Sequence, residues 1–200
     1  MDGCVLTSYD AAWPAAAEHR LAELRRVLVP LDPEALFDHI GSTSVPGLLA
    51  KPLLDLQVRM SRLPDPAELD PPLLEIGFRP HAGARDDSPG VHRDSPRGSE
   101  QVPEDVWEKR LFTASDPDTV LHVRRLDSPW SRHTVTFRDW LRAHPAEVAR
   151  YAELKQSLAR KHAGDPDFDD HTRAKTAYFD LVQERFETWA ETRGRADQHP

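Results

Sequence analysis

The sequence has 200 residues, which is enough for one domain with a substantial hydrophobic core. Its 34 acidic residues outnumber its 26 lysines and arginines, and the formal charge of -8 argues against broad nucleic-acid binding, which needs a basic face. A single cysteine, Cys4, excludes an intramolecular disulfide and a thiolate metal cluster. No apolar run approaches the roughly 18 residues of a membrane helix, and the N-terminus lacks a signal-peptide pattern, so we expect a cytoplasmic protein without a membrane partner.

The first third of the chain predicts a helix followed by two strands. Apolar residues recur at spacings of three or four over residues 11–29, as on one face of a helix. Pro30 and Pro33 end this helix. Residues 34–40 are short enough for a strand, and residues 52–60 read as a second, largely buried strand.

The middle of the chain alternates weak structural signals with polar segments. Residues 61–72 are a Pro/Asp-rich connection, and residues 73–76 predict a short helix that a glycine ends. Residues 78–81 could form a third strand. The polar loop 82–105 has the composition of a disordered segment or of a functional lid, and disorder without ligand is the expected state.

A β-hairpin and three helices complete the chain. Residues 106–112 and 119–125 predict two antiparallel strands, because the residues between them favour a turn. In the second strand His122 and Arg124 share one face, which is either solvated or lines a site. The remainder predicts three helices and a frayed polar tail at 193–200.

This element order predicts an α+β protein with a small mixed sheet that carries helices on one face. Residues 1–192 are expected to form a single domain that contains the polar loop and ends in a helical segment.

Residues 39–58 concentrate special residue types between two apolar runs. Gly41 lets backbone amides approach a ligand closely, and Ser42 with its neighbouring hydroxyls adds donors that suit phosphate oxygens. Asp55 follows on the predicted second strand. A carboxylate on such a strand, facing a Gly-Ser turn, is a common way to build a magnesium–nucleotide site. An ordinary turn beside a strand-edge acid is the alternative.

The same stretch resembles the signature of the GrpB family, HIGSTSVPGL-x-AKP-x-(I/L)-D, whose members are described as domains associated with dephospho-CoA kinase or with protein folding. The resemblance extends over most of the chain. Its further parts are Tyr9-Asp10, Trp13-Pro14, Leu121-His122-Val123, Phe137-Arg138-Asp139-Trp140-Leu141-Arg142-x-His144-Pro145, Tyr151-x-x-Leu154-Lys155 and Thr172-x-x-Lys175-x-x-Tyr178.

GrpB-like proteins are similar in turn to the nucleotidyltransferase superfamily, in which a Gly-Ser turn precedes an acidic-apolar-acidic strand motif. This resemblance implies a nucleotidyltransferase-like mixed sheet flanked by helices, with a triphosphate on the turn and Mg²⁺ on the carboxylates. Gly41-Ser42 matches the turn, and Asp55 matches the first acid. Gln57 stands where the second acid is expected; its amide oxygen could also bind Mg²⁺, but it brings no negative charge. Glu108 is the nearest positional match for a third carboxylate.

Several residues near the turn are implied to contact the ligand. Thr43 and Ser44 would join Gly41 in binding phosphate, although each hydroxyl could instead cap the turn. Lys51 would pair with a phosphate or with Asp55, and it is a candidate catalytic residue that neutralises developing charge.

Positive residues farther along the chain are further candidates. Lys109 and Arg124 on the hairpin could steer a triphosphate, and exposed strand charges explain them equally well. Lys155 and Lys175 could reach the phosphates from the C-terminal helices, or take part in ion pairs. His122 is a candidate catalytic base or ligand contact, although a lone histidine on a strand is more often structural.

These residues lead to a hypothesis with one main alternative. The protein would bind a magnesium–nucleoside triphosphate and transfer a nucleotidyl group to a small-molecule acceptor, which could be a hydroxyl, an amine or a carboxylate. The alternative, motivated by Gln57, is a non-catalytic accessory module with a degenerate nucleotide pocket. A phosphotransfer kinase is disfavoured because the chain contains no GxxxxGK[ST] loop.

Overall fold

The computed structural model describes residues 6–83, 90–96, 101–161 and 169–197, with side chains for all of these except 161, 169–177 and 194–197. The described residues form one five-stranded sheet in the order β1-β2-β5-β4-β3. Strands β2 and β5 run parallel at its centre, and the other neighbouring pairs are antiparallel. The strands are β1 (Leu36–Ile40), β2 (Leu54–Met60), β3 (Arg79–Pro80), β4 (Lys109–Ala114) and β5 (Thr119–Arg125).

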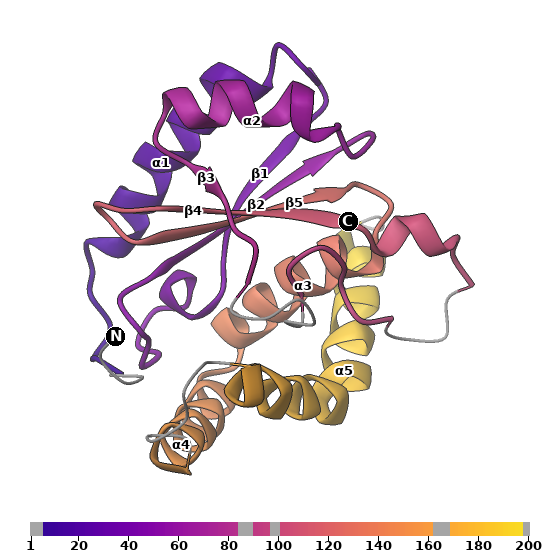
Figure 1. The fold of residues 1–200 in the computed structure, drawn as a ribbon. Coiled ribbons are helices and arrows are strands. Elements are labelled where there is room, and N and C mark those ends of the chain that lie inside the picture. The colour runs from indigo at the N-terminus through magenta and orange to yellow at the C-terminus, as the bar shows by residue number, and fades with distance from the viewer. Residues whose placement is uncertain (1–5, 84–89, 97–100, 162–168, 198–200) are drawn as a thin grey trace.

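Helices cover both faces of this sheet (Figure 1). Helices α1 and α2 lie on one face, and α3 lies on the other with α4 and α5 beyond it. The described helices are α1 (Trp13–Leu28), α2 (Pro66–Glu75), α3 (Pro129–Ala143), α4 (Pro145–Lys161) and α5 (Asp169–Asp197). The predicted α+β class, with a mixed sheet flanked by helices and a C-terminal helical segment, is confirmed. The expectation that the helices share one face is wrong, because the C-terminal helices pack over the polar face of the strands.

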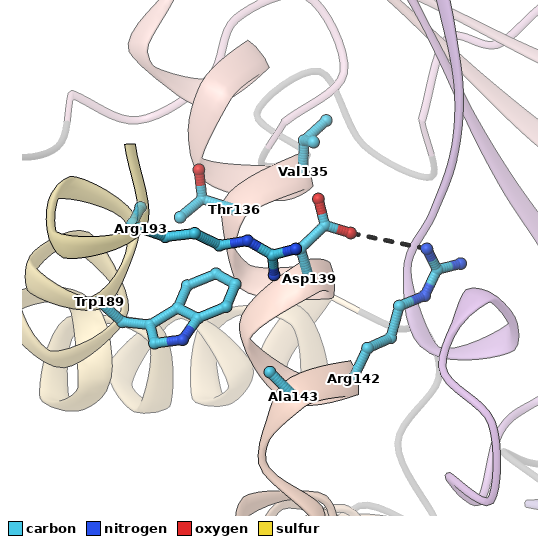
Figure 2. Close-up of a pocket in the computed structure, with 8 residues that line it drawn as sticks. Val135, Thr136, Asp139, Arg142, Ala143, Trp189 and Arg193 are labelled. Carbon is cyan, nitrogen blue, oxygen red and sulfur yellow. Dashed lines mark ion pairs between the residues drawn. The ribbon is translucent and has the colours of Figure 1, made fainter. Parts of the chain in front are cut away.

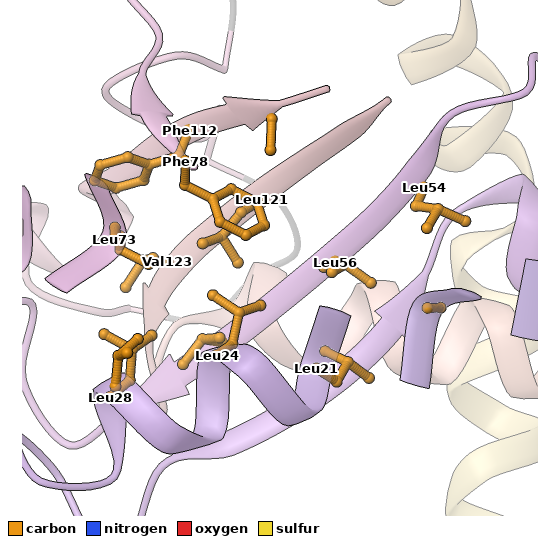
Figure 3. Packing of buried hydrophobic residues seen from close by; sticks show 14 of the residues in the cluster. Leu21, Leu24, Leu28, Leu54, Leu56, Leu73, Phe78, Phe112, Leu121 and Val123 are labelled. Atoms are coloured by element: carbon orange, nitrogen blue, oxygen red, sulfur yellow. The ribbon is translucent and has the colours of Figure 1, made fainter. Parts of the chain in front are cut away.

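The main hydrophobic core lies between the sheet and the first two helices. Even-numbered residues of β2 point to this side, and Figure 3 shows Leu54 and Leu56 among leucines of α1. Side chains of β4 and β5 extend the same core, with Phe112 and Leu121 at most 1% exposed. Because side chains alternate along a strand, the odd-numbered residues of β2 must face the C-terminal helices.

A second apolar cluster joins the C-terminal helices to the segment between β1 and β2. Its buried members are Val45, Leu48, Phe137, Trp140, Leu141, Tyr151, Val182 and Phe186. The segment that follows the Gly-Ser turn is therefore packed onto the helical layer. Each described helix is too short or too polar to cross a membrane.

Helix α2 is longer than predicted. It begins at Pro66, within the segment expected to be an irregular connection. Asp65 and Glu68 form a capping box, in which the side chain of each residue accepts the backbone N–H of the other. Pro66 suits the first turn because its missing N–H would have no partner there.

Two other boundaries also differ from the prediction. The strand expected from residue 106 begins at Lys109, because Glu104–Trp107 form a short 3-10 helix, η2. The tail expected to fray from residue 193 is helical to Asp197. In that last part, the guanidinium of Arg193 lies 5.5 Å from the ring centre of Trp189, one helical turn earlier.

Part of the polar loop 82–105 contacts the sheet. The backbone N–H of Asp94 donates to the carbonyl of Trp107 at 2.9 Å. Val91 and Asp94 are both at most 5% exposed. Residues 90–96 therefore lie against the sheet, and the expectation of disorder without ligand stays a prediction.

Candidate functional site

The turn between β1 and β2 begins with a backbone conformation that suits glycine alone. Gly41 has φ 68° and ψ −168°, a combination that residues with a Cβ rarely adopt. A Cβ on Gly41 would lie 2.2 Å from Oδ2 of Asp55. The turn therefore rests directly on the Asp55 carboxylate, so the two features that the sequence motif pairs are in contact.

Ser42 is the turn hydroxyl that lines the adjacent cavity. Its Oγ lies 2.7 Å from Nζ of Lys155, which also donates to the carbonyl of Leu49 at 2.5 Å. An ammonium can only donate, so Ser42 must accept in this bond. Its own O–H hydrogen is then left to donate to a ligand.

The next two hydroxyls shape the turn instead of lining the cavity. Thr43 Oγ1 donates to the carbonyl of Leu53 at 3.2 Å, and Ser44 Oγ donates to the carbonyl of Gly41 at 2.5 Å. Both residues are buried. The structure thus uses their side chains as caps, which was the alternative interpretation of the sequence.

Two arginines of α3 fasten this turn from the helical layer. Arg138 Nη1 donates to the carbonyl of His39 at 2.9 Å, and Arg142 donates to the carbonyl of Ser44 through Nε at 2.9 Å and Nη2 at 2.7 Å. Burial and the charges of Arg142 and Arg138 lower the pKa of His39 to about 4, so this ring is neutral at pH 7. Both ends of the turn are therefore attached to one helix.

A hollow of about 650 Å³ lies on the outer side of these arginines, between α3 and α5 (Figure 2). Arg142 and Arg193 stand on either side of Asp139 in this view, with Arg142 Nη1 3.5 Å from Asp139 Oδ1. Trp189 forms its α5 wall. None of the predicted site residues whose side chains are described lines this hollow, so the candidate site is sought elsewhere.

The candidate site is a cavity of about 360 Å³ between the polar face of the sheet and the C-terminal helices. This volume is near the lower end of the roughly 300–1,000 Å³ typical of small-molecule pockets. Predicted site residues on its sheet side are Gly41, Ser42, Asp55, Lys109, His122 and Arg124. Aromatic residues on its helical side are Trp130, Phe137, Tyr151 and Phe179. One wall is thus charged and the opposite wall is aromatic.

The charged wall is built around a carboxylate from the polar loop. Asp94 accepts from Arg124 Nε at 2.6 Å and Nη2 at 3.0 Å, and Lys109 Nζ lies 3.0 Å from its Oδ1. Burial opposes ionisation of Asp94, but the two cations outweigh it and lower its pKa. Burial lowers the pKa of Lys109 to about 8, against the pull of Asp94. At neutral pH the three groups carry one net positive charge.

Gln57 is completely buried beneath this charged wall. Its Nε2 donates to the carbonyl of Ser131 at 3.0 Å. Its Oε1 accepts from Arg124 Nη1 at 2.8 Å and from Thr134 Oγ1 at 3.0 Å. A divalent cation on this oxygen would meet the Arg124 guanidinium, and that repulsion disfavours Gln57 as a metal ligand.

His122 lies between the charged wall and Asp55. Its Nδ1 is 3.2 Å from Nζ of Lys109, and its Nε2 is 4.0 Å from Oδ1 of Asp55. Burial, with the charges of Lys109 and Arg124, lowers the pKa of His122 well below its usual value. The neutral ring must accept at Nδ1 because an ammonium only donates, so Nε2 carries the hydrogen toward Asp55. His122 is therefore arranged as a donor rather than as a base.

Three of the remaining predicted residues whose side chains the structure describes lie outside the cavity lining. Lys51 and Glu108 are exposed, and neither lines the cavity. Lys155 is buried behind Ser42. Lys175 lies on α5 in a stretch whose side chains are outside the described residues.

Several residues of the site escaped the sequence analysis. Asp94 lies in a polar loop, and its neighbours in the sequence form no motif that would identify it as a site residue. Arg142 stands in the family-like stretch of α3, but its contact with the turn spans 98 positions. Trp130 and Phe179 could not be told from core aromatics by their spacing.

The donor set allows a magnesium ion that is held mainly by phosphate oxygens. Among the described residues, no group of three or more Asp, Glu, His or Cys side chains converges as a metal site. Asp94 is already committed to two cations, whereas the Asp55 side chain is 33% exposed at the cavity. Mg²⁺ commonly binds through one or two carboxylates plus substrate phosphates, and Asp55 fits that mode.

The fold and the site thus define a mixed-sheet protein with a small polar–aromatic cavity beside a Gly-Ser turn. Residues 4–185 match the model of the family described as GrpB protein. The chain therefore belongs to the GrpB family, as its signature predicted.

Individual relatives agree with this assignment. A protein of Halalkalibacterium halodurans named UPF0157 protein BH1888 is 31% identical over 157 residues, covering 78% of this chain and 69% of the relative. A protein of Mycolicibacterium paratuberculosis named dephospho-CoA kinase is 30% identical over 193 residues, covering 92% of this chain but 46% of the relative. The chain thus spans about half the length of that relative. The crystal structure of the conserved protein GrpB from Enterococcus faecalis has the same fold, with a TM-score of 0.63 and 23% identity, covering 92% of this chain and 99% of that one.

Proposed function

We propose that the cavity binds a magnesium–nucleoside triphosphate and that the protein transfers the nucleotidyl group to a small-molecule acceptor. The observation that carries the proposal is the contact between Gly41 and Asp55 at the edge of the cavity. This contact places the Gly41-Ser42 turn, with its donor hydroxyl, beside the partly exposed carboxylate of Asp55. A metal-bound polyphosphate requires such a donor turn next to a carboxylate.

The phosphates would lie along the turn. The Ser42 hydroxyl donates to a phosphate oxygen, because Lys155 already occupies its acceptor side. Arg138 lines the cavity beside the turn, where its guanidinium donates to the carbonyl of His39 and is paired with Asp139. Thr43 and Ser44 support binding indirectly, since they hold the turn in the conformation that presents Ser42.

Asp55 would hold the magnesium ion together with phosphate oxygens, and the ion would neutralise charge on the reacting phosphate. His122 presents its Nε2–H beside Asp55 and stabilises an oxyanion there. Lys109 keeps His122 in this tautomer, so its role in the reaction is to position the ring.

Isothermal titration calorimetry with each of the four common nucleoside triphosphates, with and without Mg²⁺, tests the binding. We expect at least one nucleotide to bind with a submillimolar Kd that depends on Mg²⁺. Asp55→Asn should remove the Mg²⁺-dependent part and leave the fold intact. Absence of heat at millimolar concentration for all four nucleotides would remove the proposal.

A second candidate function is nucleotide or partner binding without catalysis, and Gln57 favours it. The second acid of the nucleotidyltransferase-like pattern is missing. Gln57 stands in its place, and its side-chain oxygen accepts hydrogen bonds from Arg124 and Thr134. A non-catalytic module would bind the nucleotide but give no product with any acceptor. Mass spectrometry of a mixed-acceptor reaction separates the two functions.

A kinase activity is not proposed for this chain. The dephospho-CoA kinase name belongs to a relative about twice as long as the segment it shares with this chain. The present sequence contains no GxxxxGK[ST] loop to carry the phosphates of a kinase reaction.

A further inference from the structure

We propose that the acceptor is a small carboxylic acid with an apolar or aromatic body, bound with its carboxylate toward Lys109 and Arg124 and its body against Trp130 and Phe179. The role as acceptor rests on the proposed function, whereas the binding of such an acid does not. Three properties of the cavity, namely its charge, its aromatic wall and its lack of a base, lead to this ligand class.

The charge of the inner wall matches one carboxylate. Lys109 and Arg124 share Asp94 as their ion-paired counter-ion, and Asp55, the other carboxylate that acts on Lys109, is assigned to the metal, so one positive charge is left over. The three side chains line the cavity and are 2–5% exposed, so an anion there is only weakly screened by water. A triphosphate, with several negative charges, would be poorly neutralised at this wall and is better placed at the turn with the metal.

The opposite wall suits an apolar body. Phe179 has its ring centre 4.4 Å from that of Phe137 and 6.2 Å from that of Trp130, so three rings form a continuous surface. Trp130 Nε1 donates to the carbonyl of Ser95 at 2.6 Å, which ties this surface to the loop that carries Asp94. A guest between the walls therefore meets cations on one side and aromatic rings on the other.

The cavity also lacks a free general base among the described residues that line it. His122 carries its hydrogen on Nε2 and has Nδ1 taken by Lys109. Asp94 is bound by two cations, and Asp55 is assigned to the metal. A hydroxyl or ammonium acceptor would have to lose a proton to such a base, whereas a carboxylate is already deprotonated at pH 7.

The reaction would then be adenylylation, or its counterpart with another base. One carboxylate oxygen forms a bond to the α-phosphorus, and the bond from that phosphorus to the bridging oxygen of the β-phosphate breaks. The electron pair leaves with pyrophosphate, and the product is an acyl–nucleotide mixed anhydride. No proton transfer and no redox partner is needed.

Calorimetry with 3-phenylpropionate, 3-phenylpropan-1-ol and 3-phenylpropylamine tests the ligand class without nucleotide. A charge-assisted contact contributes roughly 1.5–3 kcal/mol, so we expect the acid to bind at least about tenfold more tightly than either analogue. Equal or tighter binding of the alcohol or the amine would overturn the proposal.

Two variants that should change the affinity for the acid in opposite directions distinguish a direct effect on this site from a general effect on folding. Lys109→Met removes the excess positive charge and should weaken binding of 3-phenylpropionate about tenfold. Asp94→Asn keeps the shape of the side chain but frees the cations, so it should tighten binding. Arg125→Met, which removes a cation from the opposite face of β5, is the matched control and should change nothing.

The direction in which Asp94→Asn changes the affinity for 3-phenylpropionate tests the proposal even if Lys109→Met does not fold. Weaker or unchanged binding in Asp94→Asn would overturn the proposal. With nucleotide present, exchange of labelled pyrophosphate into the triphosphate should require 3-phenylpropionate. Nucleotide binding without any binding of the acid contradicts only this inference, and binding of the acid without nucleotide binding contradicts only the proposed function.

Discussion

The two faces of the central strand β2 are built for different purposes. Its even-numbered residues, such as Leu56, are buried among the leucines of α1 and make up the dry core. Its odd-numbered residues, Asp55 and Gln57, face the helical layer. There they meet a buried ionic network and a cavity instead of packed hydrocarbon.

The two faces of β2 contribute differently to stability and to ligand binding. Hydrocarbon on one face stabilises the sheet through area removed from water. The polar face must desolvate Asp94, Arg124 and Gln57, and it compensates by giving each of them partners with close to ideal distances. A defect on the first face should therefore lower stability alone, whereas a defect on the second should also change ligand binding.

The largest effect is expected where the ionic network is broken. Arg124→Met leaves Asp94 without its two-point partner and removes a donor from Gln57, and breaking a buried pair in this way costs about 3–5 kcal/mol of unfolding free energy. Urea denaturation measures the loss. Arg125→Met is the control, because its pairs with Asp105 and Asp127 are at the surface and contribute about 0–1 kcal/mol. Equal losses in the two variants would contradict the role given to the network.

On the dry face, Leu56→Ala should cost about 2–5 kcal/mol, through lost transfer free energy and the cavity it leaves. Because Leu56 points away from the site, nucleotide affinity of the folded protein should stay unchanged. Leu36→Ala, at an exposed position of β1, should cost less than about 0.5 kcal/mol. A change in nucleotide Kd in Leu56→Ala would show that the two faces are not independent.

Substitutions of two glycines, Gly41 and Gly47, test the contact between the turn and Asp55. Gly41→Ala should cost about 1–3 kcal/mol through backbone strain, and its Cβ should also displace the Asp55 carboxylate and weaken magnesium–nucleotide binding. Gly47→Ala is the matched control, since Gly47 also has a positive φ of 77° but a Cβ there would meet nothing within 4 Å. It should lose stability and keep nucleotide affinity. If both variants bind equally well, the contact between Gly41 and Asp55 does not matter for the ligand.

The smallest predicted effect is a pH dependence that arises from Lys109. Burial lowers its pKa in the folded state to about 8 from 10.5, so between these values the unfolded chain binds more protons than the folded one. Stability relative to Lys109→Met should therefore rise as pH increases from about 8 to 10.5. The groups that face this amine are Asp94 from the loop, Asp55 from β2, and His122 and Arg124 from β5. A stability difference that is flat or falls over this range would contradict the environment assigned to Lys109.

The parts of the fold with strong local signals were predictable. The period of apolar residues located the first helix, and the turn chemistry between the two hairpin strands located β4 and β5. The pairing of the Gly41 turn with Asp55 also followed from the sequence, since the motif spaces them closely. The predicted helix is shorter than α2 because residues 61–72, rich in proline and aspartate, read as a connection, whereas Asp65 and Glu68 cap a helix there.

The rest of the site depends on long-range packing that no local pattern records. Asp94 reaches Arg124 across 30 positions, and Arg142 reaches Ser44 across 98. The aromatic wall is assembled from three separate helices. The role of Gln57 as an acceptor for Arg124 and Thr134 is likewise visible only when those side chains are brought together.

The most direct test of the magnesium–nucleotide site uses Mn²⁺ as a paramagnetic substitute in the presence of nucleoside triphosphate. His122 Nε2 lies 4.0 Å from Asp55 Oδ1, so an ion on that carboxylate should broaden the ring resonances of His122, which are assigned by comparison with His122→Gln. We predict broadening in the wild-type protein and none in Asp55→Asn at the same concentrations. Sharp His122 resonances in the wild-type protein at saturating Mn²⁺–nucleotide, or equal broadening in Asp55→Asn, would contradict a metal–nucleotide site at Asp55.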